Sequence, residues 1–476
     1  MRLTIHYALD GAAVEVLEEV FSYLDNHTNL NHYISEHNNS ENSEDDGDDQ
    51  HSISSEDLED AAVSSVAISV ANPRQSLLAL SLVSRCFHRL VQPRLFAVFD
   101  QTKDKTLPFL RHIEEYPQHA MYVRTLRIEP IMRDWEWKCI GEDADFAFVS
   151  LLLCKILHQA TLVSGEFPAS LVSDLSLKDD GVQQEIIAQW LILNLPLVET
   201  LNISIPEDWS FSLLTYTVQH DRKLLSRLRV LRILDSPPSL QKRYGLQPTL
   251  DLGLAVALLD LKQLNTVVLD TCINFKKHEK LDLCVKNVVH RRCGRVACQV
   301  NRLLAACTQL QSYDLEYDGG TALDLSGLSK SKDTLERLSL RVSTLALNLL
   351  TQCQVLKYVA ITAEQFDPRR PGTRQGIHHR TRILKPPPHL LAAMLPASLE
   401  HLCLSKAYGD AQLMWQDQLM VVVKYTARKF RNLKLIDVSW RPSRQLQEEY
   451  VLIHLQLATL NNDDSDDFST AINANS

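Results

Sequence analysis

The sequence predicts an α/β protein in which a small N-terminal helical bundle precedes an irregular solenoid of parallel strands with helices outside. Three observations lead to this prediction. Apolar residues recur at helical spacing in the first hundred residues, apolar triads with the spacing L-x-x-L-x-L recur beyond residue 120, and amphipathic stretches separate the triads. The 476 residues are 45% hydrophobic and 23% charged, a balance that allows most of the chain to bury a core.

The N-terminal bundle is expected over residues 10–98 from two amphipathic segments. Residues 14–24 form a predicted helix of about three turns. Residues 77–91 form a second helix, which Pro93 is expected to end because proline has no backbone donor. Residues 26–69 between them are rich in Asn, Ser, Asp and Glu and are predicted to be a disordered acidic insert.

Two acidic stretches carry the formal net charge of -10. Residues 36–60 contain no Lys or Arg, and residues 461–476 are predicted to be a disordered acidic tail. The rest of the chain is mildly basic but has no dense basic stripe, so no nucleic-acid partner is expected. We interpret the insert as a solubilising spacer; the alternatives are an electrostatic decoy for a basic loop and a phosphorylation region around Ser43 and Ser54.

The solenoid is expected over residues 105–460, where the last two positions of each triad alternate as a strand requires. A strand and helix with one apolar face cannot stand alone, so neighbouring units are expected to share a core. A weaker tenth triad is Val172/Leu175/Leu177. The nine clear triads are Val123/Leu126/Ile128, Val198/Leu201/Ile203, Leu228/Leu231/Ile233, Leu264/Val267/Leu269, Leu310/Tyr313/Leu315, Leu335/Leu338/Leu340, Leu356/Val359/Ile361, Leu399/Leu402/Leu404 and Leu433/Ile436/Val438.

Amphipathic stretches between the triads predict the helices outside the sheet. One segment, residues 367–388, contains paired arginines, paired histidines and three prolines, and is predicted to be a flexible basic loop. The predicted helices include residues 182–195, 252–264, 300–307 and 345–353.

The segment Val14-Glu15-Val16-Leu17-Glu18-Glu19-Val20-Phe21-Ser22-Tyr23-Leu24, together with Leu77-Leu78-Ala79-Leu80-Ser81-Leu82-Val83-Ser84-Arg85-Cys86-Phe87-His88-Arg89-Leu90, resembles the F-box motif in its fungal form. Downstream triads of this kind are similar to the leucine-rich repeats that follow the F-box in that family. The resemblance implies a substrate-recognition subunit of an SCF-type cullin ubiquitin ligase, which binds a Skp-type adaptor through the F-box and an unknown protein client through the repeats. The implied adaptor-binding residues are Val14, Leu17, Phe21, Leu24, Leu77, Leu80, Val83 and Phe87.

Two features of the N-terminal segment depart from that family. The chain has Ala12-Ala13 where the family usually has Leu-Pro, and the acidic insert separates the helices. These departures keep an alternative open, in which a degenerate F-box is structural and the chain is a non-ligase repeat scaffold.

The residues flanking the second and third triad positions are expected on the concave face of the sheet, because side chains in a strand alternate. We interpret this face as the client surface, against the plainer alternative of an ordinary solvated sheet. An acidic patch in its middle, followed by two arginines, is expected. The candidates are Arg127, Glu129, Asn202, Arg232, Asp270, Asp314, Glu316, Arg337, Arg341, Tyr358, His401 and Asp437.

No catalytic chemistry is expected. The sequence contains no G-x-G-x-x-G, G-x-x-x-x-G-K, H-E-x-x-H or G-x-S-x-G motif, so we expect a non-catalytic adaptor without cofactors. A repeat-fold hydrolase is the distant alternative. A zinc site is not expected either, because no C-x-x-C pair occurs among the residues that invite one. These are Cys272, Cys284, Cys293, Cys298, Cys307, His278 and His290.

The ten cysteines show no pairing pattern and Met1 begins no charged-then-apolar leader, which predicts a reduced protein of the cytoplasm, the nucleus or both. The longest apolar stretch, residues 146–157, is shorter than the roughly 20 residues that span a bilayer, so no membrane association is expected.

Overall fold

The computed structural model divides into two compact units, Met1–Ala97 and Val98–Ser476, and each is considered by itself. It describes residues 77–79, 81–82, 85–102, 106–129, 143–164, 180–204, 209, 211–221, 223–234, 249–250, 258–270, 272–273, 282–291, 297–317, 325–345, 350–366, 389–405, 410–425, 428–439, 442–447 and 456–459. The predicted helix 14–24, the insert 26–69, the tenth triad, the basic loop 367–388 and the tail 461–476 lie outside these residues.

In the first unit, helix α3 (Arg85–Leu95) follows short helical segments at 77–79 and 81–82. The expectation that Pro93 ends this helix is wrong, because Pro93 lies inside α3. Its ring removes one backbone donor within the last turn, and the backbone N–H of Phe96 still donates to the carbonyl oxygen of Gln92 at 3.2 Å. A proline this close to the helix end therefore costs little.

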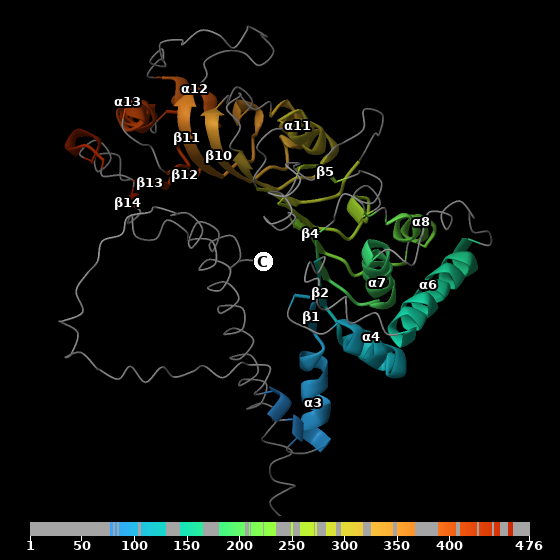
Figure 1. The fold of residues 1–476 in the computed structure, drawn as a ribbon. Helices are drawn as coiled ribbons and strands as arrows, with labels where there is room; N and C mark the ends of the chain where they lie inside the picture. The colour runs from blue at the N-terminus through green and yellow to red at the C-terminus, as the bar shows by residue number, and fades with distance from the viewer. Residues whose placement is uncertain are drawn as a thin grey trace, which may run out of the picture. The chain divides into compact units, whose positions relative to one another are not determined.

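The second unit is built on one twelve-stranded sheet in which every neighbouring pair is parallel. Figure 1 shows the strands following one another along a curved path. A separate short pair is formed by β5 (Thr249–Leu250) and β7 (Cys272–Ile273). The strands of the large sheet, in spatial order, are β1 (Val98–Asp100), β2 (Thr125–Ile128), β3 (Thr200–Ser204), β4 (Val230–Leu234), β6 (Thr266–Leu269), β8 (Asn287–His290), β9 (Ser312–Tyr317), β10 (Arg337–Leu345), β11 (Tyr358–Phe366), β12 (His401–Leu404), β13 (Leu435–Val438) and β14 (Gln456–Thr459).

All nine clear triads supply a strand of this sheet, so the predicted solenoid of parallel strands is confirmed. Register places their second positions in one row, including Leu126, Leu201 and Leu231, and these side chains are fully buried. Burying each such leucine contributes about 1.5–3 kcal/mol. The repeated triad therefore forms the continuous core of the unit.

Three strands of the sheet were not predicted. β8 has the triad spacing in Val285, Val288 and His290, but a histidine occupies the third position, where the apolar pattern requires an aliphatic residue. His290 is nevertheless buried. β1 and β14 form the two ends of the sheet.

The longer helices lie along the other side of the sheet from its open face, as expected (Figure 1). Predicted helices 182–195 and 300–307 correspond to α7 and α11. Helices in this unit are α4 (Thr106–Glu115), α6 (Asp143–Ser164), α7 (Asp180–Asn194), α8 (Ser212–His220), α11 (Ala297–Ala306), α12 (Leu390–Met394) and α13 (Asp410–Tyr425), with 3-10 turns η1 (Pro117–Tyr122), η4 (Ser326–Ser331) and η5 (Leu350–Gln352).

The predicted helix 345–353 is wrong. β10 continues through Leu345, which pairs with Phe366 of β11, and residues 350–352 form the 3-10 turn η5. Residues 346–349 lie outside the described part of the chain. The β-branched residues Val342 and Thr344 favour this longer strand. Of predicted helix 252–264, residues 258–259 are helical and a turn follows them, while residues 252–257 are outside the described part.

Buried polar side chains of α7 cap the start of α8. The backbone N–H of Phe211 donates to Glu185 Oε1 at 2.6 Å, and that of Leu214 donates to Gln189 Oε1 at 2.9 Å. Helix α8 has no capping side chain of its own at Phe211, so its first-turn donors depend on the preceding helix. Phe211 also has a left-handed backbone, with φ of 46°.

Hydrogen bonds of the same kind occur between two other pairs of elements. Gln418 of α13 accepts a hydrogen bond from the backbone N–H of Leu391 in α12 at 2.8 Å. Asn301 of α11 accepts one from the backbone N–H of Gly327 at the start of η4. A side-chain amide of one repeat thus completes the backbone of a neighbour.

Candidate functional site: the concave face of the sheet

The concave face is the side of the twelve-stranded sheet that does not contribute to the helix-covered core. Every predicted client-binding residue from Arg127 to Asp437 lies on it, because each alternates with buried core positions. The residues are spread from β2 to β13, and the structure brings them into separate groups rather than one cluster.

At the N-terminal end of this face the charges are paired. The guanidinium of Arg127 contacts Glu129 at 2.6 Å and Asp100 at 3.9 Å. Arg232 contacts Asp270 at 3.1 Å. Asn202 lies between Arg127 and Arg232 in the strand register.

Four side chains on β10 to β13 form a continuous line, which we call the aromatic ladder: Arg337, Tyr358, His401 and Asp437. The guanidinium of Arg337 lies 4.4 Å from the centre of the Tyr358 ring. The ring of Tyr358 meets that of His401 edge to face at 4.8 Å. His401 Nε2 is 2.5 Å from Asp437 Oδ2. Each side chain therefore holds the next in position.

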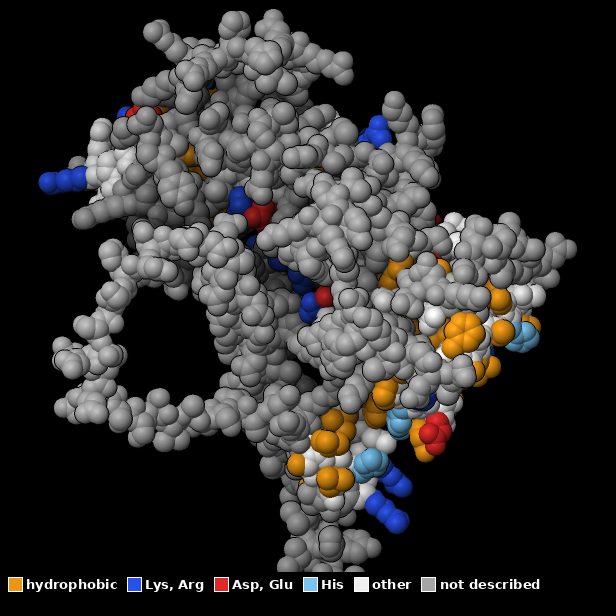
Figure 2. All heavy atoms as spheres, viewed as in Figure 1, with side chains coloured by type: hydrophobic (Ala, Val, Ile, Leu, Met, Phe, Trp, Pro, Cys, Tyr) orange, Lys and Arg blue, Asp and Glu red, His pale blue; other side chains and the backbone are white. Residues whose placement is uncertain are grey.

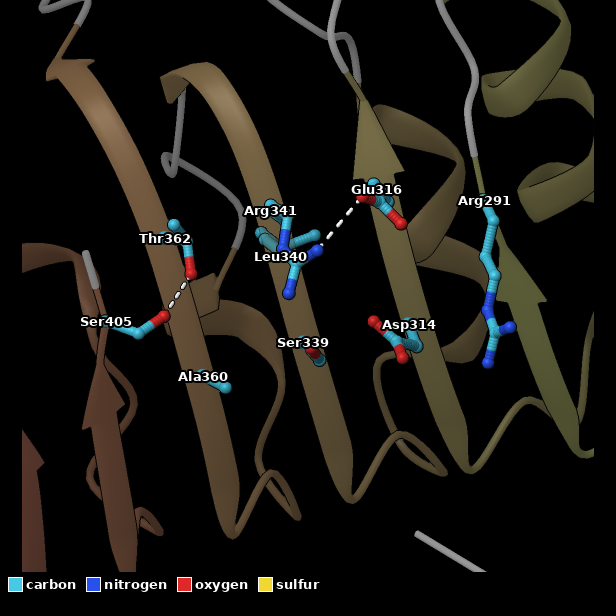
Figure 3. Close-up of a pocket in the computed structure, with 9 residues that line it drawn as sticks. All are labelled: Arg291, Asp314, Glu316, Ser339, Leu340, Arg341, Ala360, Thr362 and Ser405. Carbon is cyan, nitrogen blue, oxygen red and sulfur yellow. Dashed lines mark hydrogen bonds and ion pairs between the residues drawn. The ribbon is translucent and has the colours of Figure 1, made fainter. Parts of the chain in front are cut away.

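Beside the aromatic ladder lies a hollow, which we call the polar hollow (Figure 3). Its floor consists of small residues, Ser339 and Ala360, between strands β9 and β12. Thr362 Oγ1 and Ser405 Oγ share a hydrogen bond across one side. The residues that line it are Arg291, Asp314, Glu316, Ser339, Leu340, Arg341, Ala360, Thr362 and Ser405.

The expected acidic patch does not stand unneutralised in the structure. Glu316 contacts Arg341 at 3.0 Å, and Arg291 lies on the side of the hollow nearest Asp314 (Figure 3). Positive and negative side chains alternate across the middle of the face instead.

Burial raises the pKa of Asp314 above its ordinary value, and Ser339, Arg291 and Arg341 act in the opposite direction without cancelling it. The pKa of this carboxyl is thus higher in the folded chain than in the unfolded chain. Its ionisation opposes folding as the pH rises.

Replacing Asp314 with Asn is therefore expected to raise the free energy of unfolding at pH 7.5. The gain should shrink as the pH falls toward 3.8, where the carboxyl also becomes protonated in the unfolded chain. Urea unfolding of wild type and D314N at pH 7.5 and pH 5 measures this difference. A loss of stability of equal size at both pH values would contradict the expectation.

Sequence reasoning missed four polar residues of the polar hollow. Ser339, Thr362 and Ser405 are small hydroxyl residues that were not among the candidates for the concave face. Arg291 follows β8, the strand that the triad pattern did not detect. The spacing of Val285, Val288 and His290 is the signal that locates it.

Of the predicted adaptor-binding residues, Leu77 is buried and Phe87 is partly buried. Leu80, Val83 and the four residues between 14 and 24 lie outside the described residues. Two leucines that were not singled out, Leu78 and Leu82, are 54% and 82% exposed.

Within the described part of the chain, no group of three or more His, Cys, Asp or Glu residues is arranged to hold a metal ion. Of the cysteines considered for zinc, Cys284 is exposed, whereas Cys307 is buried. Burial raises the pKa of Cys307 to about 12, which opposes the thiolate that zinc requires.

Among the described residues, no helix is both long enough and apolar enough to cross a membrane.

No protein-family model matches the sequence, and no curated protein matches it. Among solved structures, an internalin from Listeria monocytogenes is similar, with a TM-score of 0.32 and 14% sequence identity. The match covers 57% of this chain and 64% of the internalin chain, so this chain spans less than two thirds of that protein. A likeness this distant supports no inference about activity or partners.

Proposed function

We propose that the chain is a non-catalytic recognition protein whose concave face binds a protein client. The aromatic ladder is the observation that carries this proposal. It places an arginine and a tyrosine, two residue types enriched among the dominant contacts of interfaces, in fixed positions on an open sheet face.

Pre-organisation makes the aromatic ladder suitable for binding. Immobilising a flexible side chain on association costs about 0.5–1.5 kcal/mol. The ring of Tyr358 already contacts Arg337 and His401, so much of this cost is met before a client arrives. The hydroxyl of Tyr358 is protonated at neutral pH and can donate a hydrogen bond, and burial raises its pKa further above the ordinary value of 10.0.

The same region supports a binding role over a hydrolytic one. Cys403, His401 and Asp437 lie on adjacent concave positions of β12 and β13, as in a thiol hydrolase. Burial raises the pKa of Cys403 to about 12, however, whereas a nucleophilic cysteine needs a lowered pKa. The thiol stays protonated, and Cys403 is only 1% exposed.

We further propose that residues 10–98 connect this face to an SCF-type ligase by binding a Skp-type adaptor. The resemblance to the F-box supports this, as do the exposed side chains of Leu78 and Leu82, because apolar surface of this kind is typical of helix docking. The chain would then act by effective concentration, holding a client near an activated ubiquitin. A repeat scaffold outside any ligase, favoured by Ala12-Ala13, is the second candidate.

Capture of interacting proteins by the tagged full chain separates these roles. Y358A is expected to lower client recovery by about tenfold or more, the range for a dominant contact, and to leave adaptor recovery unchanged. F21D is expected to abolish adaptor recovery and to leave client recovery unchanged. Quantitative mass spectrometry measures both.

Each variant is the control for the other. Absence of a Skp-type adaptor from the wild-type capture, or its indifference to F21D, would favour the non-ligase scaffold. Client recovery that is insensitive to Y358A would contradict a client site on the concave face.

A further inference from the structure

The polar hollow carries opposite charges in equal number. Arg291, Arg341, Asp314 and Glu316 all line the hollow, which is partly open to solvent, and Arg341 contacts Glu316 at 3.0 Å. Because Ser339 forms part of the floor, there is room for a side chain to enter between these groups (Figure 3).

This balance disfavours a charged occupant of either sign. A carboxylate that entered would approach Asp314 and Glu316, and an ammonium group would approach Arg291 and Arg341. Like charges in a partly desolvated site repel strongly, and such repulsion is a common source of specificity.

A neutral group with both a donor and an acceptor is complementary to the whole lining. A carbonyl oxygen accepts hydrogen bonds from a guanidinium, and an NH₂ group donates to a carboxylate or a hydroxyl oxygen. Thr362 and Ser405 share one hydroxyl hydrogen between them, so the second remains to donate. We infer that the polar hollow binds the side-chain carboxamide of an Asn or Gln residue presented by an extended segment of the client.

This inference rests on the proposed function and names the chemistry that the concave face selects. The raised pKa of Asp314 agrees with it, because burial disfavours the ionised carboxylate despite its hydrogen bond with Ser339, and a further donor would stabilise that carboxylate. An amide hydrogen from the client would supply one. The aromatic ladder lies beside the polar hollow on the same concave face, and it would contact the client residues that flank the carboxamide.

The full-length chain is tested with a phage-displayed library of random linear peptides. Peptides are selected on wild type and depleted on S339W, in which the indole fills the hollow. Selected sequences are expected to converge on Asn or Gln at one position. In synthetic peptides, replacing that residue with Glu, Lys or Met is expected to weaken binding by about tenfold or more, because buried polar groups then lack partners.

D314N gives a readout that does not depend on filling the hollow. Removing this charge is expected to improve binding of the Glu peptide, so that the affinities of the Gln and Glu peptides differ less than they do for wild type. The matched control is D100N, which removes a carboxylate from the concave face of β1 and should leave the preference unchanged.

Selected peptides that depend on Tyr358 but show no carboxamide preference would overturn this inference and leave the proposed function standing. Equal binding of Gln and Glu peptides to wild type would also overturn it. If no peptide remains after depletion on S339W, and none of the peptides selected on wild type is weakened by Y358A, both the inference and the concave-face proposal fail.

Discussion

Replacing Glu185 with Leu is expected to lower the free energy of unfolding by about 2–4 kcal/mol, because a hydrogen bond to a charged group is lost and a buried donor is left unpaired. Glu185 is 3% exposed and accepts from the backbone N–H of Phe211 at 2.6 Å. It also accepts from Gln189 Nε2 at 3.3 Å. Leucine has a similar volume, so the loss measures the hydrogen bonds rather than a cavity. Urea denaturation gives the total change.

Hydrogen exchange locates this effect. The amides of α8 should exchange faster in E185L, since Phe211 holds a left-handed backbone that depends on the neighbouring helix. Q184L is the matched control, because Gln184 is only partly buried on the same helix and its replacement should change stability by about 0.5 kcal/mol or less. E185Q keeps an acceptor and should lie between wild type and E185L. Equal stability of E185L and Q184L would contradict the capping role.

Replacing Gly327 with Ala is expected to lower the free energy of unfolding by about 1–3 kcal/mol, the usual range for overpacking. A methyl group at this position would lie 2.7 Å from the backbone nitrogen of Ala305 and closer still to the backbone oxygen of Asn301. Both atoms belong to α11, so relief requires η4 to move away from that helix. Movement would also stretch the hydrogen bond between Asn301 and the backbone N–H of Gly327.

S329A is the matched control for G327A, because Ser329 is an exposed residue of the same 3-10 turn. Thermal unfolding should separate the two variants by several degrees. If G327A unfolds at the temperature of S329A, the close approach of η4 to α11 does not contribute to stability.

Much of the solenoid was predictable because burial repeats along the chain. The second positions of the triads form the buried row that contains Leu126, Leu201 and Leu231. Each of these leucines can be recognised from the apolar pattern of its own strand alone. Strand β8 was not predicted, because His290 occupies the position of the third apolar residue of the triad. The end of β10 escaped because Leu345 suits a helix or a strand equally well by pattern, and pairing with β11 decides between them.

The concave face was predictable as a set of positions but not as a set of contacts. Alternation placed Arg337, Tyr358 and His401 on one face. Which strands are neighbours, and in which register, decides that Arg337 lies over Tyr358 and that Arg341 pairs with Glu316. Charge order along the chain therefore predicted an acidic patch, whereas charge order across the sheet produced alternation.

The space-filling view emphasises how apolar and charged side chains mix on the surface near α4, α6 and α8 (Figure 2). Among the exposed apolar side chains here are Phe146, Leu151 and Leu162 of α6. Helix α6 is apolar on its outer side as well as against α7 and α8, so its period alone did not indicate which side is buried.

The hydrogen bonds between a side-chain amide of one repeat and the backbone of its neighbour limit how this array can change its length. Deleting the unit that contains α7, α11 or α13 by an in-frame event would strip a different helix start of its acceptor, and inserting a duplicate would place the acceptor beside the wrong backbone. The units are therefore not interchangeable. Shuffled or shortened versions should misassemble unless the unit that provides the side-chain acceptor is moved together with the unit whose backbone N–H it accepts from.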